Sequence, residues 1–203
     1  MKIALYLGSF NPFHNGHLKC VKTALLDFKM DKVIIVPTMQ NPLKGDKVLD
    51  IDKRINIIRN ILNSEYYEAE RIVLPFMDYK YGLPKMLELS NIVHISEIEK
   101  ELIPPYYSYA TLHALKNKYC NDEIFILCGS DTIKDIPNWM NGEAIIQDYD
   151  FLIVDRPVNS ISSSSIREML RTRNKMDAYY SDNRLANYVS PNIINLLKKY
   201  YDN

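Results

Sequence analysis

The sequence lacks an excess of either charge and has no long hydrophobic run. Its 25 basic and 25 acidic side chains give a formal net charge of zero, which argues against a broad basic surface for nucleic acid or an anionic membrane. No apolar stretch approaches the roughly 20 residues that span a bilayer. We therefore expect neither nucleic acid nor a membrane as a partner, while a small local anion site stays open.

Cysteine is also scarce, and its spacing matches no metal site. The three residues are an odd number; Cys120 and Cys128 are eight apart, and Cys20 stands alone. The apolar N-terminus, residues 1–7, is too short for a signal peptide. Reduced thiols and the absence of a leader predict a cytoplasmic protein. The sequence also has no internal repeat and no low-complexity segment.

Apolar residues are plentiful, and their pattern predicts an α/β fold. They make up 47% of 203 residues, enough for one soluble domain with a real core. Short apolar runs alternate with segments of helical spacing, which is typical of a parallel sheet with helices on both faces. Strands are expected at residues 2–7, 32–36, 92–95, 123–128 and 150–154, and helices at 16–28, 52–62, 109–119, 164–173 and 191–201. Ligands then bind in loops beyond the carboxyl ends of the strands.

The segments that depart from the alternation of strands and helices indicate the domain organisation. Residues 1–203 are interpreted as a single domain. The stretch 63–89 mixes charge with four tyrosines and two prolines, and it is interpreted as an insertion or a lid. Residues 162–203 are expected to form a small C-terminal helical part, which begins at a run of four serines.

The loop after the first strand carries the most informative segment, Gly8–His17, with the sequence GSFNPFHNGH. Gly8 allows a close approach of the backbone, and a helix that starts at Asn15 and Gly16 offers free N–H groups to an anion. His14 and His17 are three apart, so imidazolium groups there would contact phosphate oxygens. Two ordinary helix-start histidines are the alternative, and zinc is a weaker one because no third ligand is near.

A second candidate anion site is the segment Ile161–Arg167, with the sequence ISSSSIR. Serine hydroxyls and N–H groups at a helix start can hold a phosphate, and Arg167, one turn later, offers a fixed fork of donors. The alternative is a capping segment followed by a solvated surface charge.

The first segment, extended to Leu18, resembles the H-x-G-H signature of nucleotidyltransferases, in the form found in nicotinate (nicotinamide) mononucleotide adenylyltransferases. The second resembles the I-S-S-T-x-I-R motif of the same family. The resemblance implies a Rossmann-like, doubly wound parallel sheet. It also implies transfer of AMP from ATP to nicotinate or nicotinamide mononucleotide in NAD biosynthesis, with Mg²⁺ accompanying ATP and pyrophosphate leaving.

The resemblance also implies a set of site residues. The catalytic residues are His14, His17, Lys44 and Arg167. The residues that bind ATP are Gly8, Ser9, Phe10, His14, His17, Gly129, Asp131, Ile161, Ser162, Ser163 and Arg167. The residues that bind the mononucleotide are Asn41, Lys44, Arg54, Ser108, Thr111, Trp139 and Arg156.

The sequence departs from the family pattern in two places. Arg156 and Ile161 are only five apart, where the family has a longer segment, and the region after Leu62 is longer. The helix arginine of the family then matches Arg54, or the helix matches residues 86–89. The acceptor therefore stays open between the acid mononucleotide, which is slightly favoured, and the amide. Phosphopantetheine or a sugar phosphate, a non-catalytic nucleotide-binding module, and a homo-oligomer also stay open.

Overall fold

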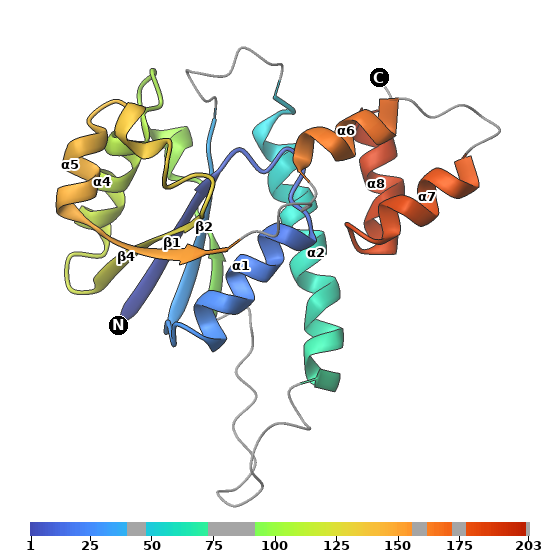
Figure 1. Cartoon of the computed structure of the whole chain (residues 1–203), viewed down its shortest axis with the longest axis horizontal. Helices are drawn as coiled ribbons and strands as arrows, with labels where there is room; N and C mark the ends of the chain where they lie inside the picture. The colour runs from blue at the N-terminus through green and yellow to red at the C-terminus, as the bar shows by residue number, and fades with distance from the viewer. Residues whose placement is uncertain (40–47, 73–91, 156–161, 172–177, 202–203) are drawn as a thin grey trace, which may run out of the picture.

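A five-stranded parallel sheet forms the centre of the computed structural model, which describes residues 1–39, 48–72, 92–155, 162–171 and 178–201 (Figure 1). Its strands are β1 (Lys2–Gly8), β2 (Lys32–Pro37), β3 (Val93–Ile95), β4 (Glu123–Gly129) and β5 (Asp150–Val154). Each lies within one residue of the expected ends, and all four pairings are parallel. The predicted Rossmann-like fold class is confirmed.

The order of the strands locates the ligand crevice. Along the sheet they run β3-β2-β1-β4-β5, so the chain winds outward from β1 in one direction and then returns to its other side. Connections from β1 and β4 therefore leave toward opposite faces, and sheets of this kind bind ligands in a crevice at such a point. Gly8 ends β1 and Gly129 ends β4, so these two glycines border the expected crevice.

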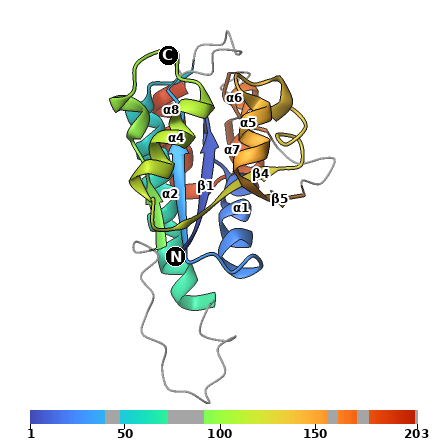
Figure 2. The ribbon, with the colours of Figure 1, turned by 90° about the vertical axis from the view of Figure 1, so that its left-hand side faces the viewer.

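Side-chain alternation in β1 divides the core into two layers. Ile3 and Leu5 belong to the cluster beneath α4 (Ser108–Lys118) and α5 (Gly142–Asp148), and Figure 2 looks onto this face. Ala4 and Tyr6 belong to the other cluster, with α1 (Asn15–Leu26) and α2 (Ile51–Ile72). Both faces of the sheet are thus covered, as its apolar strands require.

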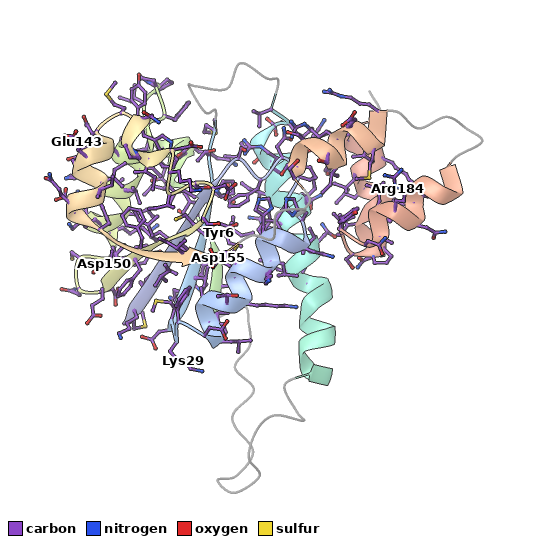
Figure 3. The ribbon with its side chains drawn as sticks, viewed as in Figure 1. Tyr6, Lys29, Glu143, Asp150, Asp155 and Arg184 are labelled. Carbon is purple, nitrogen blue, oxygen red and sulfur yellow. The ribbon has the colours of Figure 1, made fainter. Side chains whose placement is uncertain are left out.

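The C-terminal helices α6 (Ser163–Arg171), α7 (Ala178–Ala186) and α8 (Pro191–Tyr201) form a group beside α2 (Figure 1). Ile193, Ile194 and Leu197 of α8 are buried in the same cluster as Ala4 and Tyr6. The helical part expected at 162–203 therefore shares the main core. Figure 3 marks the two sides of the molecule with Glu143 on α5 and Arg184 on α7, and labels Tyr6 near the centre.

Three helical features differ from the expected pattern. The short helices α5 and α7 were not expected, because neither carries a long apolar stripe. Helix α2 runs to Ile72 instead of residue 62, so residues 63–72 of the expected insertion extend this helix. Residues 73–89, the rest of that stretch, lie outside the described residues. None of the helices in the described ranges is both long and apolar enough to cross a membrane.

Candidate active site

His14 and His17 form a reciprocal cap at the start of α1. The backbone N–H of Gly16 donates to Nδ1 of His14 at 3.1 Å, and the backbone N–H of His14 donates to Nδ1 of His17 at 3.3 Å. The two rings lie 3.8 Å apart between centroids, and both side chains are buried. The spacing of three residues is therefore built into the helix start.

These hydrogen bonds distinguish the two nitrogens of each imidazole. In both rings Nδ1 accepts from a backbone N–H, which makes Nε2 the ring nitrogen that can donate a proton in a hydrogen bond. An N–H donor at Nε2 can stabilise charge that develops on a phosphate oxygen.

The backbone of the same turn does not offer the free N–H groups that the sequence suggested. Asn15 donates its N–H to the carbonyl of Tyr188 at 2.8 Å, and Gly16 donates to His14. The N–H of His17 donates to the carbonyl of His14 at 2.8 Å. The expectation of free N–H groups is therefore wrong for Asn15 and Gly16.

An aromatic cluster holds the ring of His17 in place. Phe10 meets it edge-on at 5.1 Å between ring centroids, and Phe13 and Tyr6 lie at 5.2 and 6.1 Å. Phe10 has a φ of 44°, in the left-handed region, and its ring covers Gly8. A Cβ at Gly8 would lie 2.9 Å from that ring, so the glycine accommodates Phe10. Gly8 therefore makes room for Phe10, and Phe10 packs against the ring of His17.

Gly16 gives the same kind of room to His14, which leads to a first prediction. A Cβ at position 16 would lie 2.9 Å from Cε1 and 3.1 Å from Nδ1 of the His14 ring. Since that ring is buried, Gly16→Ala should displace it and lower the kcat of any reaction that uses the His14 ring by about 10- to 100-fold. The helix propensity of alanine opposes the cost of disturbing the His14 cap, so the melting temperature should change little. Steady-state kinetics and thermal melts check both; unchanged kcat would show that the ring position is unimportant.

The second motif meets the first through α6. Arg167 donates from Nη1 to the carbonyl of Asn11 at 2.7 Å and from Nη2 to Oγ of Ser164 at 3.0 Å. Ser163 donates its hydroxyl to the carbonyl of Pro12 at 2.9 Å. Ser162 caps the helix, because its Oγ accepts the N–H of Ser165 at 3.1 Å. Ser162 is thus a cap, as one alternative expected, whereas Arg167 is held beside the loop of His14 and His17 and is not a solvated surface charge.

Arg54 does not lie where a mononucleotide contact was expected. Its side chain is 1% exposed, and it donates to the carbonyls of Leu49, Ser9, Thr38 and Met39 at 2.6–3.2 Å. Burial lowers the pKa of its guanidinium, and the charges of Tyr201, Asp50 and Glu99 oppose that shift. Arg54 therefore joins the loops after β1 and β2 through backbone carbonyls, from inside the protein.

Thr111 is likewise inside the protein. It is fully buried, and its hydroxyl donates to Oε1 of Glu99 at 2.8 Å. Burial raises the pKa of the Glu99 carboxyl, while the Met39 N–H, the Thr111 hydroxyl and Arg54 act in the opposite direction. The mononucleotide contact expected of Thr111 is thus replaced by a role in holding Glu99.

The other expected residues stand as follows. Gly129 is buried at the end of β4, and its carbonyl accepts the N–H groups of Thr132 and Ile133 in the turn that carries the exposed Asp131. Trp139 is half-buried against the cluster beneath α4 and α5, and Ser108 begins α4. Four expected residues lie outside the described ranges: Asn41, Lys44, Arg156 and Ile161.

Two residues that sequence reasoning missed lie at the centre of this site. Asn11 is 4% exposed, and its Oδ1 accepts from the hydroxyl of Tyr201 at 2.6 Å and from the N–H of Leu49 at 3.3 Å. Asn11 was inside the first motif, but Tyr201 carried no signal. In the described part of the chain, no three His, Cys, Asp or Glu side chains gather as a metal site would require.

The sequence agrees with one family over most of its length. The sequence model of the cytidylyltransferase-like family matches residues 5–169. A protein of Aliarcobacter butzleri, named probable nicotinate-nucleotide adenylyltransferase, is 30% identical over 156 residues, which cover 77% of this chain and 72% of that protein. The chain belongs to the cytidylyltransferase-like family, with the nicotinate-nucleotide adenylyltransferases.

Further relatives agree with this membership. The Campylobacter jejuni protein of the same name is 29% identical over 203 residues, covering 100% of this chain and 97% of its own. Nicotinic acid mononucleotide adenylyltransferase of Plasmodium falciparum, solved with NaAD, has a similar fold, with a TM-score of 0.67 and 20% identity over 99% of this chain and 97% of that one. The resemblance drawn from the two motifs is confirmed.

Proposed function

We propose that the chain transfers AMP from ATP to nicotinate mononucleotide, giving the dinucleotide and pyrophosphate in the synthesis of NAD. One observation supports this most: Arg167 of the second motif bonds the loop that presents His14 and His17. Two groups of donors from distant segments thus converge beside the crevice at the end of β1. Such an arrangement suits a ligand with several phosphates.

The reaction needs no covalent intermediate. A phosphate oxygen of the mononucleotide attacks the α-phosphorus of ATP, and the bond from this phosphorus to the bridging oxygen of pyrophosphate breaks. The Nε2–H groups of His14 and His17 donate to phosphate oxygens as negative charge moves onto the leaving pyrophosphate. A guanidinium has five N–H donors, so Arg167 can hold Asn11 and Ser164 and still donate to a phosphate. Lys44 is proposed to add positive charge to the same phosphates.

Magnesium enters this proposal together with ATP. In such sites Mg²⁺ is held by phosphate oxygens and water with few protein ligands. Its chemistry is to offset charge on the phosphates, while the chain's own donors orient them.

The mononucleotide side of the site rests on fewer contacts. We propose Asn41, Lys44 and Arg156 for its phosphate, Trp139 as a platform for its ring and Ser108 as a polar contact. Arg54 donates directly to the carbonyls of Thr38 and Met39. Thr111 donates to Glu99, which accepts the N–H of Met39. Both residues therefore support the mononucleotide side from inside the protein. We place the reaction in the cytoplasm, as the reduced cysteines suggest.

The acid mononucleotide should be the better acceptor. The relatives above are named for the nicotinate form, and a carboxylate is recognised by N–H donors or an arginine. We expect kcat/KM for nicotinate mononucleotide to exceed that for the amide. A value at least tenfold higher for the amide, about 1.4 kcal/mol of transition-state binding, would reverse this assignment.

The same assay distinguishes the alternatives. Pyrophosphate release is measured with Mg-ATP and each of four acceptors: the acid mononucleotide, the amide, phosphopantetheine and a sugar phosphate. Turnover with one of the last two alone would move the chain to another acceptor class. ATP binding without release in any mixture would indicate a nucleotide-binding module instead.

A further inference from the structure

The hydroxyl of Tyr201, the last residue of α8, reaches the loop that carries the histidines. It donates to Oδ1 of Asn11 at 2.6 Å, across 190 positions of the sequence. Asn11 is buried and lies three residues before His14. The C-terminal helix therefore contacts the site loop by a specific hydrogen bond in addition to apolar packing.

Asn11 connects Tyr201 to Arg167 and to the segment before α2. Its carbonyl accepts from Nη1 of Arg167 at 2.7 Å, and its Oδ1 also accepts from the N–H of Leu49 at 3.3 Å. One residue thus connects α6, α8 and the segment before α2. Without the hydroxyl of Tyr201, Oδ1 of Asn11 keeps only one of these two hydrogen bonds, the longer one from the N–H of Leu49.

The surroundings keep the hydroxyl of Tyr201 protonated. Burial raises its pKa strongly, although the positive charges of Arg167 and Arg54 act to lower it. The group is therefore a neutral donor throughout the physiological range. The influence of both guanidinium groups shows that Tyr201 lies within electrostatic reach of Arg167 and of Arg54.

We propose that Tyr201 is a positioning residue for adenylyl transfer, because its hydroxyl fixes Asn11 and thereby sets Arg167 and the loop of His14. This role rests on the proposed function. A loop that is fixed before ATP binds costs less free energy to order in the transition state. Loss of the hydroxyl should therefore affect turnover as well as folding.

Tyr200 provides a matched control on the same helix. Its hydroxyl accepts a hydrogen bond from Nδ2 of Asn56 on α2 at 2.8 Å, and its ring lies under Nζ of Lys53 at 5.4 Å. Tyr200→Phe removes one hydroxyl and one side-chain hydrogen bond, as Tyr201→Phe does. The contact that it removes connects α8 to α2 and leaves Asn11 untouched.

The experiment compares the two variants with the unmodified chain in kcat, KM, ATP affinity and melting temperature. Tyr201→Phe should lower kcat by about tenfold, near the upper end for one lost hydrogen bond, and should weaken ATP binding by about threefold, near the lower end. Tyr200→Phe should keep kcat and ATP affinity within about twofold. Similar melting temperatures for both variants would show that the difference does not come from stability.

Failure of this inference is distinguishable from failure of the proposed function. Turnover in the unmodified chain with equal kcat in both variants would overturn the role of Tyr201 and leave the function intact. Absence of dinucleotide from the unmodified chain would remove the function. ATP affinity, measured by calorimetry without a mononucleotide, then decides whether Tyr201 positions the loop for ATP: weaker binding in Tyr201→Phe alone supports this role, and any other result overturns it.

Discussion

Replacing His17 with alanine should lower kcat of adenylyl transfer by about 10²- to 10³-fold, roughly 2.7–4 kcal/mol, the range for loss of one preorganised donor. Its Nδ1 is taken by the backbone N–H of His14, so the chemistry depends on the donor at Nε2. Three aromatic rings surround the imidazole and fix its direction. The fold should survive, because the substitution lies at the first turn of a single helix.

A second variant separates the cap from the chemistry. In His17→Asn, the side-chain oxygen can take the place of Nδ1 and keep the cap, while the donor at Nε2 is lost. We expect this variant to melt above His17→Ala yet remain as slow. His113, exposed on α4, supplies the control, since His113→Ala should leave kcat unchanged. Near-normal turnover in folded His17→Asn would refute a direct role of Nε2.

Exchange of Arg167 for lysine should be nearly as damaging although the charge is kept. The guanidinium bonds the carbonyl of Asn11 and the hydroxyl of Ser164 at the same time, and a single ammonium cannot reproduce this planar arrangement. Each lost hydrogen bond to a charged group costs about 1.5–3 kcal/mol. We expect kcat/KM for ATP to fall by roughly 10- to 100-fold, since 1.36 kcal/mol is a factor of ten in rate.

The matched control lies one turn further along the same helix. Arg171 is exposed on α6, so Arg171→Lys makes the same chemical change away from the loop. Steady-state kinetics at varied ATP should show normal values for this variant. If Arg167→Lys had the same kinetic constants as Arg171→Lys, the guanidinium of Arg167 would have no part in binding the phosphates.

The sheet could be predicted because its strands are short apolar runs bounded by turn residues. Both ends of β5 were predicted correctly from the run 150–154, and β1 ends at Gly8, one residue later than predicted. Helices without a clear apolar stripe were not predicted; α5, for example, buries only Gly142 and Ile145. The end of α2 was missed because charged and tyrosine-rich sequence continues a helix without a break in local propensity.

The candidate site could be predicted where its residues are contiguous. His14, His17 and Arg167 belong to two compact motifs, and the structure brings these motifs together. Arg54 was assigned to the mononucleotide because a lone arginine on an amphipathic helix does not reveal whether it contacts a ligand or the backbone. The contact of Tyr201 with Asn11 depends on how α8 packs, which no local pattern encodes. Tertiary burial, rather than residue type, decided these cases.

The most direct measurement follows the α-phosphate of ATP. Mg-ATP labelled at the α-phosphorus is mixed with nicotinate mononucleotide and the unmodified chain, and the products are separated. We expect the label in the dinucleotide, with unlabelled pyrophosphate formed in equal amount. Label found only in ATP or AMP, or a phosphoryl group transferred from the γ-position instead, would contradict adenylyl transfer by this chain.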